Sequence, residues 1–204
     1  MKKDSFLFFH FNLFFSSVEK DQRKTIIKNC YYPILNIAKE HNIPINIEAS
    51  ARTLLEIKKI DKNFIKILKN LVKDRKLYFV GSGFNQIIAP IVPPEINKKN
   101  LQIGNTFYKK ILDHVPKTAL INEMAFSDNI MNIYKEMGYN SVILDYENTI
   151  LAEKKHKRNN LKSNYYKTIY QKNIEIVFAS SFLFQQFQNC IYGDISFNKY
   201  IDIL

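Results

Sequence analysis

The sequence predicts an α/β fold of parallel strands with flanking helices, and two observations indicate it. Short apolar runs rich in Ile, Val and Phe alternate along the chain with longer segments in which apolar residues recur at helical spacing. This alternation is typical of parallel βαβ units, and near-continuous apolar strands are typical of a sheet buried on both faces. A β/α barrel and an open doubly wound sheet both fit this pattern, and in either one the functional groups lie at the carboxyl ends of the strands.

The first half of the chain supplies three predicted strands, each an apolar run of strand length. The helical pattern over residues 21–41 contains Pro33, which should bend or divide that helix because proline lacks an N–H. Two further helices are expected over 51–60 and 61–73, and Asp61 is a suitable N-cap for the second. The predicted strands are residues 5–11, 43–47 and 77–80.

The second half of the chain continues the alternation. A loop with three prolines follows the third strand, and a helix is expected over residues 95–112. Gly138 ends a helix expected over 128–137. The polar stretch 151–164 predicts a loop. The remaining predicted elements are strands at 119–121, 141–144, 168–170 and 174–178 and helices at 182–189 and 197–204.

Polar side chains directly follow five of the predicted strands. Because the carboxyl ends of parallel strands meet at one edge, we expect these side chains to converge on one rim. A rim with such donors and acceptors suits a hydroxyl-rich ligand, which also needs aromatic surfaces. The polar groups are His10 and Asn12 after the first strand, Glu48 after the second, Gln86 after the third, Asn122 and Glu123 after the fourth and Asp145 after the fifth. The candidate aromatic platforms are Phe11, Phe84, Phe126 and Tyr146.

Taken singly, several of these residues also have a structural interpretation. His10 can be a structural histidine, Glu48 can favour the N-terminus of the following helix, and Asp145 can cap a turn. The four histidines lack the spacing of zinc ligands. Residues 81–83 lack the third glycine of a dinucleotide fingerprint, and no P-loop is present. We therefore predict neither a metal nor a cofactor.

The net charge of +11 invites a nucleic-acid interpretation, which the composition does not favour. Of the 30 basic residues, 26 are Lys, whereas planar recognition of phosphates and bases favours Arg. The densest basic run, residues 153–158, is short and has the composition of a solvated loop. We predict no nucleic-acid partner.

The cysteine count and the hydropathy of the chain are the two features from which we predict the cellular compartment. Cys30 and Cys190 cannot build a disulfide framework, which favours a reducing compartment and a cytoplasmic protein. The N-terminus has the outline of a signal peptide, but Asp4 lies in its basic region and His10 interrupts its apolar stretch. We expect a buried first strand there instead. No run reaches the roughly 18 apolar residues of a membrane span, so no membrane partner is predicted.

Three segments carry a family resemblance. They read GSGFNQIIAP from Gly81, VPPEINKKNLQIGNTFYKKIL from Val92 and PKTALINEMAFSDNIMNIYKEMGYNSVILD from Pro116, and together they resemble the catalytic domain of glycoside hydrolase family 57. The resemblance runs from His10 to about Asp145. It implies an incomplete (β/α)7-type barrel. Residues 1–204 would form a single domain that is the N-terminal portion of this barrel and is truncated relative to the family.

The resemblance also assigns roles. The family motif Trp-Leu-Pro-Glu-x-Ala-Phe matches the residues around Glu123, which makes Glu123 the candidate nucleophile. His10 matches the first histidine of the family's opening motif, Asn12 stands for its second histidine, and Gln86 stands for a histidine after the third strand. The candidate substrate-binding residues are thus His10, Asn12, Glu48, Gln86 and Asp145.

The implied activity is retaining cleavage or transfer of glycosidic bonds in an α-glucan or related polysaccharide. The family's general acid is an Asp further along the chain, and no residue here is assigned to it. The alternative is a catalytically silent carbohydrate-binding remnant of the same fold. A metal-dependent polysaccharide deacetylase would need an Asp-Asp pair and a His-x-x-x-His set, and neither occurs. The sequence predicts no particular oligomeric state.

Overall fold

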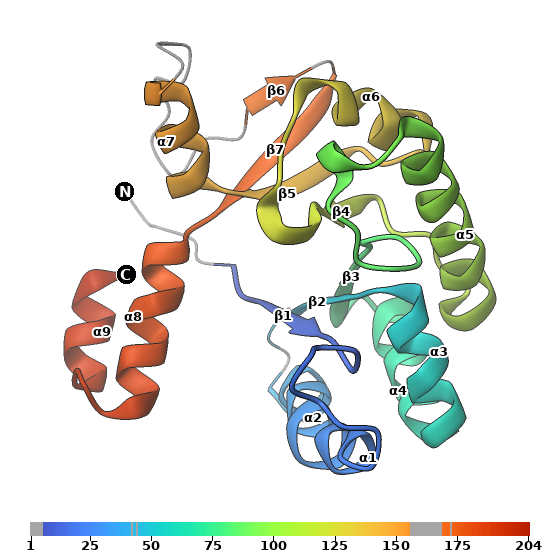
Figure 1. Cartoon of the computed structure of the whole chain (residues 1–204). Helices are drawn as coiled ribbons and strands as arrows, with labels where there is room; N and C mark the ends of the chain where they lie inside the picture. The colour runs from blue at the N-terminus through green and yellow to red at the C-terminus, as the bar shows by residue number, and fades with distance from the viewer. Residues whose placement is uncertain (1–5, 42, 44, 156–168, 172) are drawn as a thin grey trace.

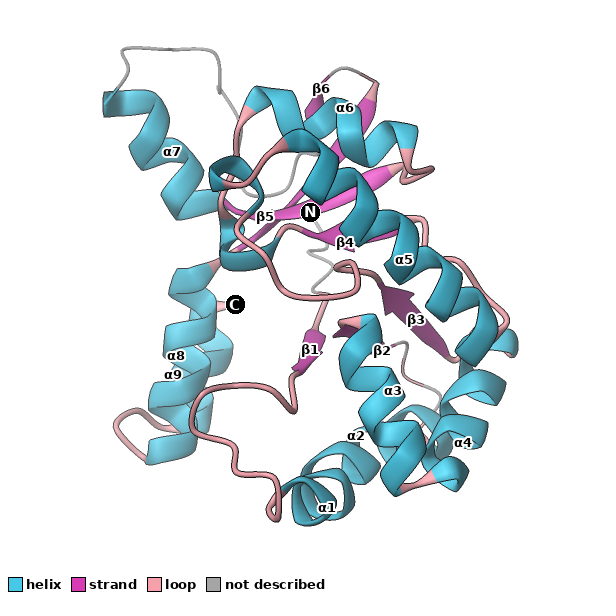
Figure 2. Ribbon diagram, turned by 45° about the vertical axis from the view of Figure 1, so that its right-hand side comes forward, coloured by secondary structure: helices cyan, strands magenta, loops and turns pink. Residues whose placement is uncertain are grey.

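The strands form one curved wall, which Figures 1 and 2 show from two sides. A computed structural model describes residues 6–41, 43, 45–155, 169–171 and 173–204. One sheet has the order β1-β2-β3 and the other has the order β4-β5-β7-β6. The strands are β1 Phe8–Phe11, β2 Ile45–Ala49, β3 Leu77–Val80, β4 Thr118–Leu120, β5 Ser141–Asp145, β6 Ile169–Gln171 and β7 Ile174–Ala179.

The two sheets are joined just beyond the end of β3. The N–H of Gly81 donates to the carbonyl of Thr118 (3.0 Å), and the N–H of Leu120 donates to the carbonyl of Gly81 (2.8 Å). This parallel bridge between Gly81 and Ala119 makes β1 to β5 and β7 one parallel wall, so the predicted α/β fold of an incomplete barrel is confirmed. Strand β6 is the exception to the prediction of parallel strands, because it pairs antiparallel with β7.

Helices α2 to α6 line the outer side of this wall, whereas α7, α8 and α9 lie beyond the ends of β5 and β7 (Figure 1). Most helices lie where the sequence predicts them. A π-helical turn, Ile27–Tyr31, separates α1 from α2 directly before Pro33, which confirms the expected division. Asp61 caps α4 by accepting the N–H of Phe64 at 3.0 Å, as predicted. None of the described helices is long and apolar enough to cross a bilayer. The helices are α1 Arg23–Ile26, α2 Tyr32–Glu40, α3 Ala51–Ile60, α4 Lys62–Lys73, α5 Pro94–Leu112, α6 Asp128–Glu136, α7 Tyr146–Lys155, α8 Ser181–Tyr192 and α9 Phe197–Ile203.

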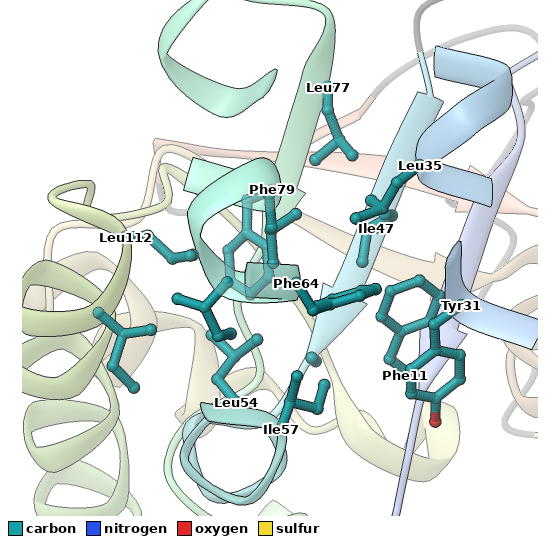
Figure 3. Close-up of a cluster of buried hydrophobic side chains, with 14 of the residues drawn as sticks. Phe11, Tyr31, Leu35, Ile47, Leu54, Ile57, Phe64, Leu77, Phe79 and Leu112 are labelled. Atoms are coloured by element: carbon teal, nitrogen blue, oxygen red, sulfur yellow. The ribbon is translucent and has the colours of Figure 1, made fainter. Parts of the chain in front are cut away.

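Side chains alternate between the two faces of the wall, as the period of two in a strand requires. The outer face of β1 to β3 packs on α2 to α5 in a large apolar core, part of which Figure 3 shows. There Phe11 stacks on Tyr31 with ring centroids 4.0 Å apart, and Phe64 packs against both. The inner face carries a smaller cluster around Val80 and Leu120. Because Phe11 points outward, His10 points to the inner side, and Glu48 does so on β2.

One predicted loop is partly helical. The polar stretch 151–164 was expected to be a loop, but α7 runs to Lys155, and residues 156–168 lie outside the described part of the chain. The cause is a local cap, because Asp145 Oδ1 accepts the N–H of Asn148 at 2.7 Å. A carboxylate at this position satisfies an N–H that the first helical turn leaves without a helical partner.

The loop after β3 is anchored on α5. Asn100 accepts the N–H of Asn85 (2.8 Å) and donates to the carbonyl of Asn85 (3.0 Å). The buried Tyr108 hydroxyl lies 2.9 Å from the carbonyl oxygens of both Ala49 and Gly83. Gly104 allows the close approach, because a Cβ there would lie 2.6 Å from the carbonyl carbon of Gly83. The loop that carries Gln86 is therefore held by its backbone.

The close approach at Gly104 predicts a reversal of ordinary helix propensity. Glycine to alanine inside a helix normally stabilises by about 1 kcal/mol. Gly104→Ala should instead destabilise the protein by about 2 kcal/mol, because the added methyl group overpacks against the Gly83 backbone. Urea unfolding measures the difference, with Gln102→Ala at an exposed position of α5 as the control. A stabilised Gly104→Ala variant would contradict the packing described.

Candidate functional site

The rim of the wall brings four of the predicted site residues into one chain of contacts. His10 and Glu48 are register partners on β1 and β2, and His10 Nδ1 contacts Glu48 Oε2. Glu48 is completely buried, whereas the His10 side chain is 40% exposed. On the other side of the ring, His10 Nε2 lies 3.0 Å from Gln86 Nε2, and Gln86 Oε1 accepts from Asn12 Nδ2 at 2.8 Å. Residues up to 76 positions apart in the sequence thus meet at the ends of β1, β2 and β3.

Two carboxylates act on the protonation of His10. Burial disfavours the imidazolium and would lower its pKa, but the hydrogen bond to Glu48 and the charges of Glu48 and Glu123 outweigh this and raise the pKa of His10. A buried carboxylate and an exposed one thus both favour the protonated ring.

Glu123 lies in a strained turn directly after β4. The turn spans Asn122–Met124, and both Glu123 (φ 55°) and Met124 (φ 51°) have left-handed backbone conformations. Such conformations cost a residue with a side chain about 1 kcal/mol or more, and they concentrate at functional sites. The preceding Asn122 is buried and donates to the carbonyl of Ser82 at 3.1 Å, which ties the turn to the loop after β3. The Glu123 side chain itself is exposed.

Asp145 has a different environment from the other site candidates. It is buried, and its two oxygens accept the N–H of Asn148 (2.7 Å) and the N–H of Ser181 (3.0 Å). These N–H groups belong to the first turns of α7 and α8. Asp145 therefore ties two helix N-termini to the end of β5, which agrees with its structural interpretation as a cap.

Glu147 joins the same arrangement and was not among the predicted site residues. Its carboxylate accepts from the hydroxyl of Ser180 (2.7 Å) and from the N–H of Ser181 (3.0 Å). Burial would raise the pKa of Glu147, but the hydrogen bonds from Ser180 and Ser181 outweigh it and lower the pKa. The only signal for this role in the sequence is the pair of serines at the start of α8.

The predicted aromatic platforms are mostly part of the packing. Phe11 is 1% exposed and stacks in the outer core, so its prediction as a platform is wrong. Phe84 packs on Phe107, Tyr146 packs edge-on against Phe178, and Phe126 packs on the second core cluster.

The rim contains an arginine pair that sequence reasoning missed. The guanidinium groups of Arg23 and Arg52 both stack on Phe14, with the carbon of each group 4.5 Å and 3.9 Å from the ring centre. Arg23 also donates to Glu56 at 2.9 Å. These contacts fix the segment that follows Asn12. Within the described residues, no group of three or more His, Cys, Asp or Glu is arranged to hold a metal ion.

A comparison with family models identifies one family over nearly the whole chain. The model of glycosyl hydrolase family 57 matches residues 6–199. A protein named alpha-amylase 1 from Dictyoglomus thermophilum is 25% identical over 116 residues, which are 56% of this chain and 17% of that protein.

Two solved structures share the fold. The 4-alpha-glucanotransferase from Thermococcus litoralis matches with a TM-score of 0.71 and 16% identity over 85% of this chain and 28% of its own. The alpha-amylase AmyC from Thermotoga maritima matches with a TM-score of 0.72 and 12% identity over 89% of this chain and 46% of its own. This chain spans less than half the length of each relative.

The left-handed backbone of Glu123 predicts a difference between two substitutions. Glu123→Gly and Glu123→Ala both remove the carboxylate, but only glycine adopts this backbone without strain. The glycine variant should therefore be more stable than the alanine variant by about 1 kcal/mol, measured by urea unfolding. If the alanine variant is equally stable or more stable, Glu123 does not have the conformation described.

The raised pKa of His10 predicts a pH-dependent part of the stability. A histidine whose folded pKa lies above its unfolded value, about 6.5, stabilises the fold fully below that value. This stabilisation is lost as the pH rises through the folded pKa. Between pH 6 and 8.5 the urea midpoint of the wild type should fall more than that of His10→Gln. His41→Gln, an exposed site at the end of α2, is the control, and parallel curves for wild type and His10→Gln would contradict the pairing.

Proposed function

Because the chain belongs to glycosyl hydrolase family 57, we propose that it carries the first part of a carbohydrate-active site in which Glu123 is the nucleophile. The exposed carboxylate of Glu123, in a strained turn at the rim and within electrostatic reach of His10, is the observation that carries this proposal. The substrate class is an oligosaccharide or polysaccharide. An α-glucan is the first candidate, since relatives carry the names alpha-amylase and 4-alpha-glucanotransferase.

The proposed chemistry is a double displacement with retention of configuration. A carboxylate oxygen of Glu123 attacks the anomeric carbon as the glycosidic C–O bond breaks, and the leaving oxygen takes a proton from a general acid. The resulting glycosyl ester is then attacked by an acceptor hydroxyl, which restores the carboxylate. Water as the acceptor gives hydrolysis, and a sugar hydroxyl gives transfer. Neither step needs a cofactor.

The rim residues have separate tasks in this proposal. His10, Asn12 and Gln86 offer ring and amide groups that hydrogen-bond sugar hydroxyls, and all three have side chains that are at least partly accessible. Glu48 is buried behind His10 and acts through it. Asp145 supports the rim through α7 and α8, because both of its oxygens already accept backbone N–H groups.

A second candidate function is glycan binding without turnover. Two rim carboxylates that sequence reasoning offered beside Glu123 are engaged, Glu48 with His10 and Asp145 with two helix N-termini. Neither is free to serve as the general acid, and this observation favours the second candidate. The predicted cytoplasmic location and the predicted lack of a nucleic-acid partner stay predictions.

An activated substrate distinguishes the two functions. An α-glucosyl fluoride has a good leaving group that needs little help from an acid, so the 204-residue chain should release fluoride and form an ester on Glu123. Glu123→Gln should lower fluoride release at least about a thousandfold, as the loss of a nucleophile does in other enzymes. Glu136→Gln, an exposed glutamate paired with Lys98, is the matched control.

Fluoride release is followed with an ion electrode, and the ester by intact mass. If the wild type neither releases fluoride nor forms the ester, the proposed enzyme is wrong. Calorimetric binding of maltooligosaccharides by that same inactive chain would identify the binding protein instead.

A further inference from the structure

The hydrogen-bond chain at the rim has a fixed direction, and its starting point is a backbone group. The N–H of Phe14 can only donate, and it donates to Asn12 Oδ1 at 2.9 Å. Asn12 therefore presents its amide nitrogen to Gln86 Oε1 at 2.8 Å. Because Gln86 Oε1 faces Asn12, the amide nitrogen Nε2 of Gln86 faces His10 Nε2, at 3.0 Å. An amide nitrogen is a donor only, so His10 Nε2 has to accept.

The direction of this hydrogen-bond chain also decides whether the other ring nitrogen of His10, Nδ1, carries a proton. If Nε2 of His10 accepts, the ring proton lies on Nδ1, which contacts Glu48 Oε2. A carboxylate accepts and does not donate, so Glu48 and the Asn12–Gln86 pair favour the same tautomer from opposite sides. Neutral histidine is held as the Nδ1–H form, in which Nε2 faces the rim.

Glu48 is placed to hold the Nδ1 side of the His10 ring and to do little else. It is 0% exposed, so a ligand at the rim does not reach it. It stands directly opposite His10 in the parallel register of β1 and β2, two strands whose outer faces pack in the main core. Its Oε1 atom is buried and has no hydrogen-bond partner within the described residues. The Glu48 carboxylate therefore interacts with His10 through Oε2 alone.

We propose that Glu48 is a positioning residue that fixes His10 as the Nδ1–H tautomer, so that Nε2 of His10 accepts a hydrogen bond from a sugar hydroxyl. For the identity of the ligand, this inference rests on the proposed function. Gln86 Nε2 uses the lone pair of His10 Nε2 at 3.0 Å, so a sugar hydroxyl binds His10 only when the exposed Gln86 side chain moves aside. A hydroxyl both donates and accepts, so it can then donate to His10 Nε2 and accept from the displaced Gln86 amide. An ether oxygen or a fluorine at the same place could accept from Gln86 but could not donate to His10.

Nitrogen-15 NMR of the histidine rings tests the tautomer without any ligand. His10 signals are identified by their loss in His10→Gln and recorded above the pKa of the ring. The wild type should show the Nδ1–H pattern. Glu48→Leu removes the acceptor and should move His10 to the Nε2–H form that free histidine prefers. Glu136→Leu, at a glutamate that pairs with Lys98 and has no part in this chain of contacts, is the control and should leave the His10 pattern unchanged.

A second variant guards against failure of Glu48→Leu to fold. Glu48→Gln keeps the shape and an acceptor oxygen but removes the charge, so the tautomer should persist while the ring pKa falls. A change of this kind in the ring is not expected from a purely structural role. The Nε2–H pattern in the wild type, or an unchanged ring in both Glu48 variants, would overturn the proposed positioning.

Ligand measurements test the second half of the inference. In Glu48→Leu the dissociation constant for a maltooligosaccharide should rise about tenfold, the effect of losing one good hydrogen bond, and less in Glu48→Gln. Singly deoxygenated or fluorinated sugars should reproduce the loss at one hydroxyl. If the ring patterns are as expected but no oligosaccharide binds, the proposed function fails and the tautomer assignment stands. If oligosaccharides bind to both Glu48 variants as tightly as to the wild type, the hydroxyl assignment fails and the proposed function stands.

Discussion

The rest of the structure depends on the bridge between Gly81 and Ala119. Two backbone hydrogen bonds there turn two short sheets into one parallel wall. The bridge needs glycine, because a Cβ at Gly81 would lie 2.8 Å from the Pro116 side chain and 2.9 Å from the Tyr139 hydroxyl. Without this joint, the ends of β1 to β3 and the turn after β4, which Asn122 ties to the carbonyl of Ser82, would not share a rim.

The joint also explains why a polar rim can be rigid. The loop after β3 begins at the bridge and is then held at its backbone by Asn100 and Tyr108 from α5. Gln86 follows immediately, so its exposed side chain extends from a fixed backbone. On the other side, the hydrogen bond from the N–H of Phe14 sets the orientation of the Asn12 amide. Rim groups placed in this way lose little further entropy when a ligand binds.

The sequence predicted the parts of this fold that depend on local pattern, and it missed those set by long-range contacts. Most strands, most helices and the meeting of the ends of β1 to β3 follow from periodicity and parallel pairing. The α7 helix depends on a cap from Asp145, and the antiparallel β6 depends on pairing that composition does not encode. Phe11 was assigned to the rim although the alternation of the strand turns it into the core. The sequence could not show that Glu48 is buried, because a buried glutamate and an exposed one can both stand at the end of an apolar strand.

One imidazole, that of His10, is influenced by two carboxylates in different environments, the buried Glu48 and the exposed Glu123. Both act on the protonation of His10, one from a buried position on β2 and the other from an exposed, strained turn after β4. A buried carboxylate without a hydrogen-bonding partner is costly, so Glu48 stays where it is only if His10 donates to it. The proton that satisfies Glu48 is then withheld from Nε2, which leaves the rim side of the ring as an acceptor. Two glutamates with the same chemistry thus have different environments because of where the wall places them, one buried against the ring and the other exposed at the rim.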